Sequence, residues 1–172
     1  MTTLAIIGGT GVTQIRGLEI IEQKAIPTPY GDPSTEFIIG KLHNINVVFL
    51  ARHGNPHTIA PHEINYRANI RALKDLGVEQ IIAVAAVGGI TNEMAPGRII
   101  FPDQIIDYSY GREHSFFSDS PGKVTHIDFT FPYSAVLRTR LINAATHCLP
   151  DFTTHGVYAC TQGPRLETAA EI

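Results

Sequence analysis

Short apolar segments bounded by turn residues recur along the chain and indicate β-strands. Residues 3–9 (TLAIIGG), 45–51 (INVVFLA) and 80–90 (QIIAVAAVGGI) are almost continuously apolar, which is typical of strands buried on both faces. Residues 18–26 and 36–42 are more amphipathic and flank a turn-rich stretch. The pattern therefore predicts at least three buried strands in the first part of the chain.

Two segments show the spacing of amphipathic helices. Residues 63–77 predict one helix, with Gly77 at the position of a C-terminal cap. Residues 134–149 predict a second, with Ser134 as its N-cap. The expected apolar faces are Tyr66, Ile70 and Leu73 in the first helix, and Leu137, Leu141, Ala144 and Cys148 in the second.

The later part of the chain contains further strands and a long loop. Residues 97–109 predict a strand interrupted at Pro102, and residues 155–161 predict a last strand. Residues 109–131 are rich in Gly, Ser, Asp, His and aromatic residues, so we expect a loop there.

Apolar strands that alternate with helices predict an α/β fold with a mixed, largely parallel central sheet flanked by helices. We expect one domain over residues 1–172. Residues 165–172 (RLETAAEI) begin like a helix and stop without a cap signal, so we expect the domain to be truncated at its C-terminus.

Composition excludes several classes of protein. Hydrophobic residues make up 44% of the 172 residues, which is enough for a sizeable core. The formal net charge of -3 and the scattered basic residues argue against a nucleic-acid partner. No segment has the length of a membrane span, and the N-terminus lacks the charged region of a signal peptide. Cys148 and Cys160 show neither metal-site spacing nor a disulfide framework, so we expect a cytoplasmic protein.

Candidate chemistry follows the strand ends, where ligands bind in open α/β sheets. Residues 8–11 (GGTG) can form either a tight turn or a loop whose N–H groups and Thr10 hydroxyl bind an anion. Their spacing matches neither the dinucleotide nor the triphosphate fingerprint. Arg52 follows a buried strand and suits phosphate or carboxylate, although a surface arginine is an equal alternative. If four such strand ends lie side by side, they form one pocket.

Three histidines, His53, His57 and His62, raise the alternative of a metal site. His53 and His57 have the spacing of two ligands on a helix, but Pro56 and Pro61 disfavour a helix there. We therefore expect no metal, and we expect His53 to donate to the same anion as Arg52.

Two other strand ends carry ligand-binding candidates. Residues 85–90 (AAVGGI) offer small side chains against which a flat ligand or a phosphate could lie, or else a packed turn. Glu167 and Glu171 are four residues apart at an expected helix start, where a carboxylate has a plain capping role. A buried, ionised carboxylate at Glu167 would instead accept N–H donors from a purine base.

These motifs together resemble the methylthioadenosine phosphorylase and trimeric purine nucleoside phosphorylase family over the whole chain. The resemblance rests on AIIGGTG, ARHGNPHTIAPHEINYRANIRALKDLGV, AVGGI, PGRIIFPDQIIDYS, VTHIDFTFPY and CTQGPRLETAAEI. It implies a homotrimer that uses no metal or organic cofactor. Inorganic phosphate, as co-substrate, attacks C1′ of a purine nucleoside through a transition state similar to an oxocarbenium ion.

The resemblance also implies site residues by position. Phosphate contacts are expected at Thr10, Arg52, His53 and Ala86. Substrate contacts are expected at Ala85, Val87, Gly88, His126, Leu166 and Glu167. Ala85 stands where the methylthioadenosine enzymes commonly have threonine, and His126 resembles the residue offered to the 5′ end of the substrate by a neighbouring subunit.

Glu167 bears on the choice of base. Family members selective for 6-aminopurines have serine here, whereas 6-oxopurine enzymes have glutamate, which accepts the N1–H of hypoxanthine or guanine. The GPRLET segment is most similar to methylthioinosine phosphorylases, which implies conversion of S-methyl-5′-thioinosine to hypoxanthine and 5-methylthioribose 1-phosphate.

Several alternatives stay open. Within the family they are a methylthioadenosine phosphorylase and a general inosine or guanosine phosphorylase. Outside it they are a Rossmann-type nucleotide-binding module and a metal-dependent hydrolase built on the three histidines. Family members carry further site residues beyond residue 172, so we expect this segment alone to lack part of its pocket and to be inactive.

Overall fold

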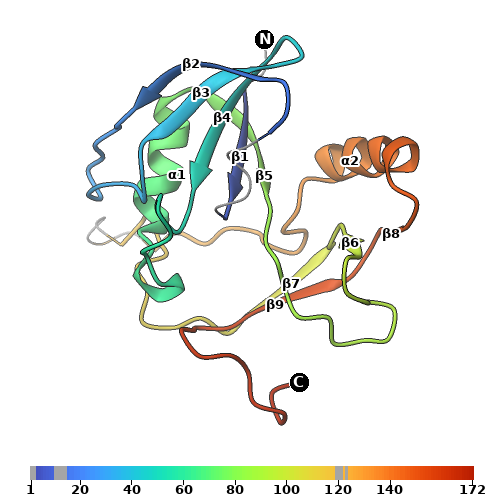
Figure 1. Cartoon of the computed structure of the whole chain (residues 1–172). Helices are drawn as coiled ribbons and strands as arrows, with labels where there is room; N and C mark the ends of the chain where they lie inside the picture. The colour runs from blue at the N-terminus through green and yellow to red at the C-terminus, as the bar shows by residue number, and fades with distance from the viewer. Residues whose placement is uncertain (1–2, 10–14, 119–121, 123) are drawn as a thin grey trace. The chain divides into compact units, whose positions relative to one another are not determined.

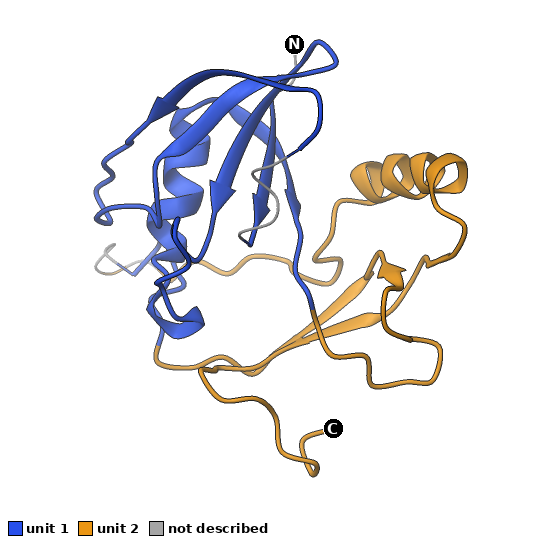
Figure 2. Cartoon of the chain, in the orientation of Figure 1, with its two compact units in different colours: residues 1–86, 112–119 blue, residues 87–111, 120–172 orange. Residues whose placement is uncertain are grey.

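The computed structural model describes residues 3–9, 15–118, 122 and 124–172, which fall into two compact units (Figure 2). Unit 1 comprises Met1–Ala86 and Arg112–Asp119, and unit 2 comprises Val87–Gly111 and Ser120–Ile172. In the described part of the chain, no helix combines the length and the apolar character needed to cross a membrane.

Unit 1 is built on a five-stranded sheet in the order β2-β3-β4-β1-β5 (Figure 1). The strand β1 runs parallel to both of its neighbours, β4 and β5, whereas β2, β3 and β4 form an antiparallel meander. The prediction of an α/β fold with a mixed sheet is thereby confirmed. The strands are β1 Thr3–Gly8, β2 Leu18–Lys24, β3 Phe37–Leu42, β4 Ile45–Ala51 and β5 Val78–Ala83.

The apolar pattern of β4 sets the core of unit 1. Five consecutive residues of β4, from Val47 to Ala51, are buried, as the continuous apolar run predicts. The helix α1, Tyr66–Asp75, packs against one face of the sheet through its own buried residues. The core cluster consists of Ala5, Phe37, Val48, Leu50, Ala72 and Leu73.

The ends of α1 agree with the sequence prediction better than its buried face does. Gly77 follows the helix with a φ of 74°, the left-handed conformation of a C-terminal cap. Leu73 is buried as expected, but Ile70 is 38% exposed and Tyr66 is only half-buried. The buried face is Ala68, Asn69, Ala72 and Leu73. Small side chains at two of these positions let the helix approach the sheet closely, which hydrophobicity alone does not predict.

Unit 2 contains two short parallel strand pairs and the helix α2, Ala135–Cys148. Pro102 separates β6 from β7, as the sequence predicts, and the Ser134 side chain accepts a hydrogen bond from the Leu137 N–H as an N-cap. The predicted apolar stripe of α2 is wrong in part, because Ala144 and Cys148 are exposed and Ala145 is buried. The strands are β6 Ile99–Ile100, β7 Gln104–Asp107, β8 Phe152–Thr153 and β9 Val157–Cys160.

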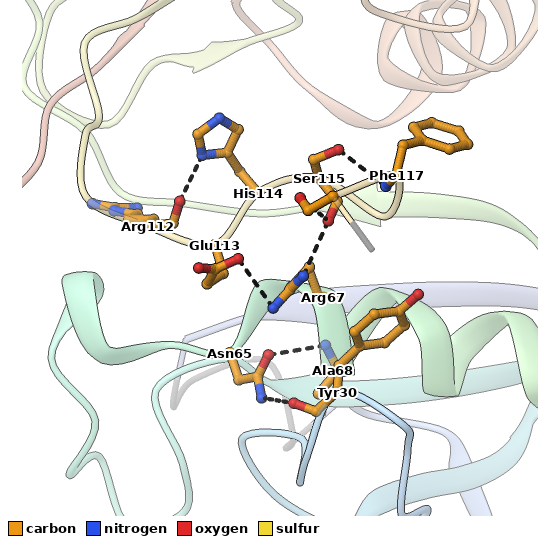
Figure 3. A network of polar contacts seen from close by, with 10 residues as sticks. Tyr30, Asn65, Arg67, Ala68, Arg112, Glu113, His114, Ser115 and Phe117 are labelled. Carbon is orange, nitrogen blue, oxygen red and sulfur yellow. Dashed lines mark hydrogen bonds and ion pairs between the residues drawn. The ribbon is translucent and has the colours of Figure 1, made fainter. Parts of the chain in front are cut away.

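A polar network joins the segment Arg112–Asp119 to the rest of unit 1 (Figure 3). The Arg67 guanidinium on α1 donates to the Ser115 carbonyl at 3.2 Å and pairs with the Glu113 carboxylate at 3.2 Å. Its Cζ lies over the Tyr30 ring, 5.0 Å from the ring centre. Its Nε is buried and has no hydrogen-bond partner among the described residues. Arg67 therefore connects three separate parts of the sequence through one side chain.

We expect Arg67→Met to loosen residues 113–118 while unit 1 stays folded. Methionine keeps much of the apolar contact with Tyr30 but removes the donors to Ser115 and Glu113. Loss of hydrogen bonds to a charged group should lower amide protection in that segment roughly tenfold, measured by hydrogen exchange. Arg71→Met on the same helix is the matched control, because Arg71 pairs with the exposed Asp75 one turn away. Equal loss of protection in both variants would contradict the connecting role of Arg67.

Candidate active site

Three strand ends lie side by side at the carboxyl edge of the unit 1 sheet. The register pairs Gly8 of β1 with Ala51 of β4, and Ile7 with Ala83 of β5. The pairing continues just past the strands, because the Arg52 N–H donates to the Gly8 carbonyl at 3.0 Å and the Val84 N–H donates to the Ile7 carbonyl at 2.8 Å. The predicted convergence is therefore confirmed for these three ends. Thr10 lies outside the described residues.

Arg52 is fixed across this edge by its side chain as well as by its backbone. The guanidinium Nη1 donates to the Val84 carbonyl at 2.8 Å, so Arg52 of the β4 end bridges to the β5 end. The residue is only half-buried. A guanidinium has five N–H donors, and one hydrogen bond to a carbonyl leaves others to bind an oxyanion.

His53 is one of the few buried polar residues of the described chain, with 8% of its surface exposed. Its Nδ1 lies 2.9 Å from the Ile59 carbonyl oxygen. The N–H groups of Thr58 and Ile59 both donate to the His53 carbonyl at 2.9 Å, so the loop folds back on this residue. Gly54 begins that loop with a φ of 80°. Burial lowers the pKa of His53 below its ordinary value, and the hydrogen bond to Ile59 opposes that shift in part.

The other two histidines do not complete a metal site with His53. The rings of His53 and His57 stack with centroids 4.3 Å apart and planes at 6°. A metal ion binds to an imidazole nitrogen in the plane of the ring. Because the two ring planes are stacked and nearly parallel, one ion cannot lie in both of them. Both His57 and His62 are exposed, and among the described residues no three His, Cys, Asp or Glu side chains gather as a metal site.

The residues expected from AAVGGI follow β5 in an extended, irregular stretch. Ala85, Ala86, Val87 and Gly88 are all exposed. The 80–90 strand prediction is wrong beyond Ala83, and β5 is half-buried rather than buried. His126 is exposed in the irregular part of unit 2. These placements neither support nor contradict the ligand contacts expected of these residues.

Glu167 differs from its expected setting. Residues 161–172 contain no helix, and both Glu167 and Leu166 are exposed, so a buried carboxylate at a helix start is wrong. The Thr161 hydroxyl donates to the Glu167 Oε1 at 2.7 Å and lowers the pKa of this carboxyl. Glu167 is consequently ionised at neutral pH, and an ionised carboxylate only accepts hydrogen bonds.

Glu171 stabilises an irregular turn and does not cap a helix. The Arg165 guanidinium contacts both of its carboxylate oxygens, at 2.7 and 2.8 Å, and the Thr168 N–H donates to it at 2.7 Å. These interactions, the Arg165 hydrogen bonds above all, lower the pKa of Glu171 to about 2. The local pairing replaces the helical hydrogen bonds that the residue pattern predicted.

Three partners of the site residues were not found from the sequence. The Val84 and Ile59 carbonyls position Arg52 and His53, and Thr161 positions Glu167. Carbonyl groups carry no residue-specific signal. The Thr161–Glu167 contact spans six residues through an irregular turn, so no helical or strand period marks it.

Comparison with known proteins identifies the family and several relatives of this chain. The Phosphorylase superfamily profile matches residues 3–172. The probable S-methyl-5′-thioinosine phosphorylase of Pseudomonas syringae pv. tomato is 55% identical over all 172 residues, which cover 70% of that protein. The 6-oxopurine nucleoside phosphorylase of Pyrococcus furiosus is 46% identical over 177 aligned positions, which cover all of this chain and 66% of that protein.

The fold also matches solved structures. Methylthioadenosine phosphorylase from Schistosoma mansoni in complex with adenine superimposes with a TM-score of 0.90 and 30% identity, covering 99% of this chain and 69% of that one. The chain thus spans about two thirds of the length of these relatives. By its sequence and by its fold, this chain belongs to the phosphorylase superfamily.

Proposed function

We propose that the intact protein catalyses phosphorolysis of a purine nucleoside, with S-methyl-5′-thioinosine as the preferred substrate. The products are hypoxanthine and 5-methylthioribose 1-phosphate. The observation that carries the proposal is Arg52, held between the ends of β1, β4 and β5 by the Gly8 and Val84 carbonyls. It offers fixed cationic donors where the strand ends of an open α/β sheet bind ligands.

In this reaction, Arg52 and His53 hold the phosphate that attacks C1′ of the ribose. Two fixed contacts reduce the orientational freedom of the nucleophile, which lowers the entropic part of the barrier. The positive charge of Arg52 compensates the charge of the phosphate as it approaches. Thr10 and Ala86 are proposed as further phosphate contacts. The reaction needs inorganic phosphate as co-substrate and neither a metal nor an organic cofactor.

Glu167 is proposed to select the base. Its carboxylate, whose pKa the hydrogen bond from Thr161 lowers, can accept the N1–H of a 6-oxopurine. Adenine has no N1–H and would place a lone pair against the carboxylate, which is unfavourable. The names of the relatives in Pseudomonas and Pyrococcus support a 6-oxopurine. Ala85, Val87, Gly88 and Leu166 are proposed to line the rest of the nucleoside site.

The assembly proposed for the intact protein is a cytoplasmic homotrimer in which His126 faces the 5′ end of a neighbour's substrate. Its support is the exposure of the segment around His126. Val124, Ile127, Phe129 and Phe131 are each 59% exposed or more, so this segment offers apolar side chains that a second subunit would bury in the proposed trimer.

Arg52→Gln in the full-length protein should raise the KM for phosphate. The loss of a charge-assisted contact to an oxyanion predicts an increase of roughly 10- to 100-fold. The KM for the nucleoside should change little, because Arg52 is not proposed to touch it. Arg52→Lys keeps the positive charge but lacks the planar guanidinium group. Its KM for phosphate should lie between the values of the wild type and Arg52→Gln. Initial rates over a phosphate series measure this, and an unchanged phosphate KM would refute the assignment.

Glu167→Ser should shift preference from methylthioinosine toward methylthioadenosine. Removing the acceptor of the N1–H should lower kcat/KM for methylthioinosine roughly 10- to 100-fold. Parallel assays with methylthioinosine, methylthioadenosine and inosine in phosphate buffer measure the shift. Glu171→Ser is the matched control, because it removes the other carboxylate of the same turn.

Each outcome of that assay decides between named alternatives. A wild-type preference for methylthioadenosine would overturn the role given to Glu167. A preference for inosine would keep that role but assign a general purine nucleoside phosphorylase. An equal shift in the Glu171→Ser control would show that the shape of the turn, and not Glu167, selects the base.

A further inference from the structure

The hydrogen bond between His53 and Ile59 fixes which ring nitrogen can meet a ligand. A backbone carbonyl oxygen only accepts hydrogen bonds, so the Nδ1 that lies 2.9 Å from it must carry the proton. In the neutral ring the other nitrogen, Nε2, then holds a lone pair. Because Nδ1 is occupied, Nε2 is the ring nitrogen through which His53 would contact phosphate.

The surroundings of His53 favour this neutral form. The ring is buried, and the two charged or titratable groups that act on it, Arg52 and His57, both lower the pKa of His53 further. Only the hydrogen bond to Ile59 acts in the opposite direction. Near pH 7, Nε2 is therefore an acceptor and does not donate.

We propose that His53 accepts a hydrogen bond from the hydroxyl group of hydrogen phosphate and thereby makes the anion site selective for oxyanions that carry a proton. Arg52 donates to the charged oxygens, and His53 receives the one O–H. Sulfate has a similar shape and charge but no proton near pH 7, so one of its oxygens would face the Nε2 lone pair. This inference rests on the proposed function, because it deepens the role of the same phosphate site.

Inhibition by sulfate tests the inference directly in the full-length protein. Sulfate stays a dianion across the useful pH range, so any change of its inhibition constant with pH reflects protonation of the protein and not of sulfate. At pH 8 we expect that constant to exceed the phosphate KM at least tenfold, because a sulfate oxygen and the Nε2 lone pair are both acceptors and cannot form a hydrogen bond. Below pH 6.5, the ordinary pKa of histidine, His53 gains its second proton as the pH falls through its lowered pKa. Nε2–H then donates, and sulfate should bind more tightly.

Two variants separate His53 from its neighbours. His53→Asn can keep a donor near the Ile59 carbonyl but has no counterpart of Nε2, so sulfate inhibition should lose its pH dependence and the preference for phosphate should fall. His57→Phe keeps a stacked ring without a titratable group. It should move the pH dependence to higher pH, because His57 no longer opposes protonation of His53, and it should leave the discrimination at pH 8 intact.

A spectroscopic measurement complements the kinetics. In protein labelled with ¹⁵N-histidine, Nε2 of His53 should keep the chemical shift of an unprotonated nitrogen at pH 7.5, both without and with saturating phosphate. Protonation of Nε2 on phosphate binding would overturn the inference, since His53 would then be a donor.

The outcomes distinguish this inference from the proposed function. Phosphate-dependent turnover with equally strong inhibition by sulfate at pH 8 would overturn the acceptor role alone. Persistence of the pH dependence in His53→Asn would overturn the acceptor role in the same way. Absence of any phosphate-dependent product would overturn the proposed function as well.

Discussion

The parallel pairing of β1 with both β4 and β5 is the constraint on which the candidate site depends. Parallel neighbours end at the same edge of a sheet, so the residues after β4 and β5 are brought beside Gly8. The antiparallel strands β2 and β3 lie on the far side of β4, and β3 contributes Phe37 to the core. Arg52 and Val84 are 32 positions apart in the sequence, so a different order of these strands would separate them.

Backbone carbonyls fix the two proposed phosphate ligands, and this gives them different chemical characters. The Val84 carbonyl takes one of the many Arg52 donors and leaves a cation that still donates. The Ile59 carbonyl takes the single proton of neutral His53 and leaves an acceptor. Because both partners are backbone groups of the fold, the side chains are oriented before any anion arrives. Such preorganisation avoids reorganisation during the reaction.

Sequence patterns predicted those features that depend on local chemistry. Apolar runs located β1 and β4, Pro102 marked an interruption, and Gly77 and Ser134 marked helix ends. The predictions that were wrong concern features that depend on tertiary packing. The buried face of α1 depends on how closely the helix meets the sheet. The helix expected after residue 165 is replaced by the Arg165–Glu171 pair, whose geometry helix propensity does not describe. At the site, Arg52 and His53 were placed correctly at a strand end, but the carbonyls that orient them carry no sequence signal.

The exposure of Glu167 places a condition on base selection in the proposed complex. A carboxylate in water discriminates weakly, because water replaces any hydrogen bond that a wrong base fails to make. Strong rejection of adenine therefore requires that water be excluded from Glu167 in the proposed complex. The adjacent Leu166 is 85% exposed and offers an apolar surface that a flat base could cover. Thr161 keeps the carboxylate ionised, and so an acceptor, while this happens. Selectivity would then arise once the base is bound and water is excluded, because Glu167 can then distinguish an N1–H from a lone pair.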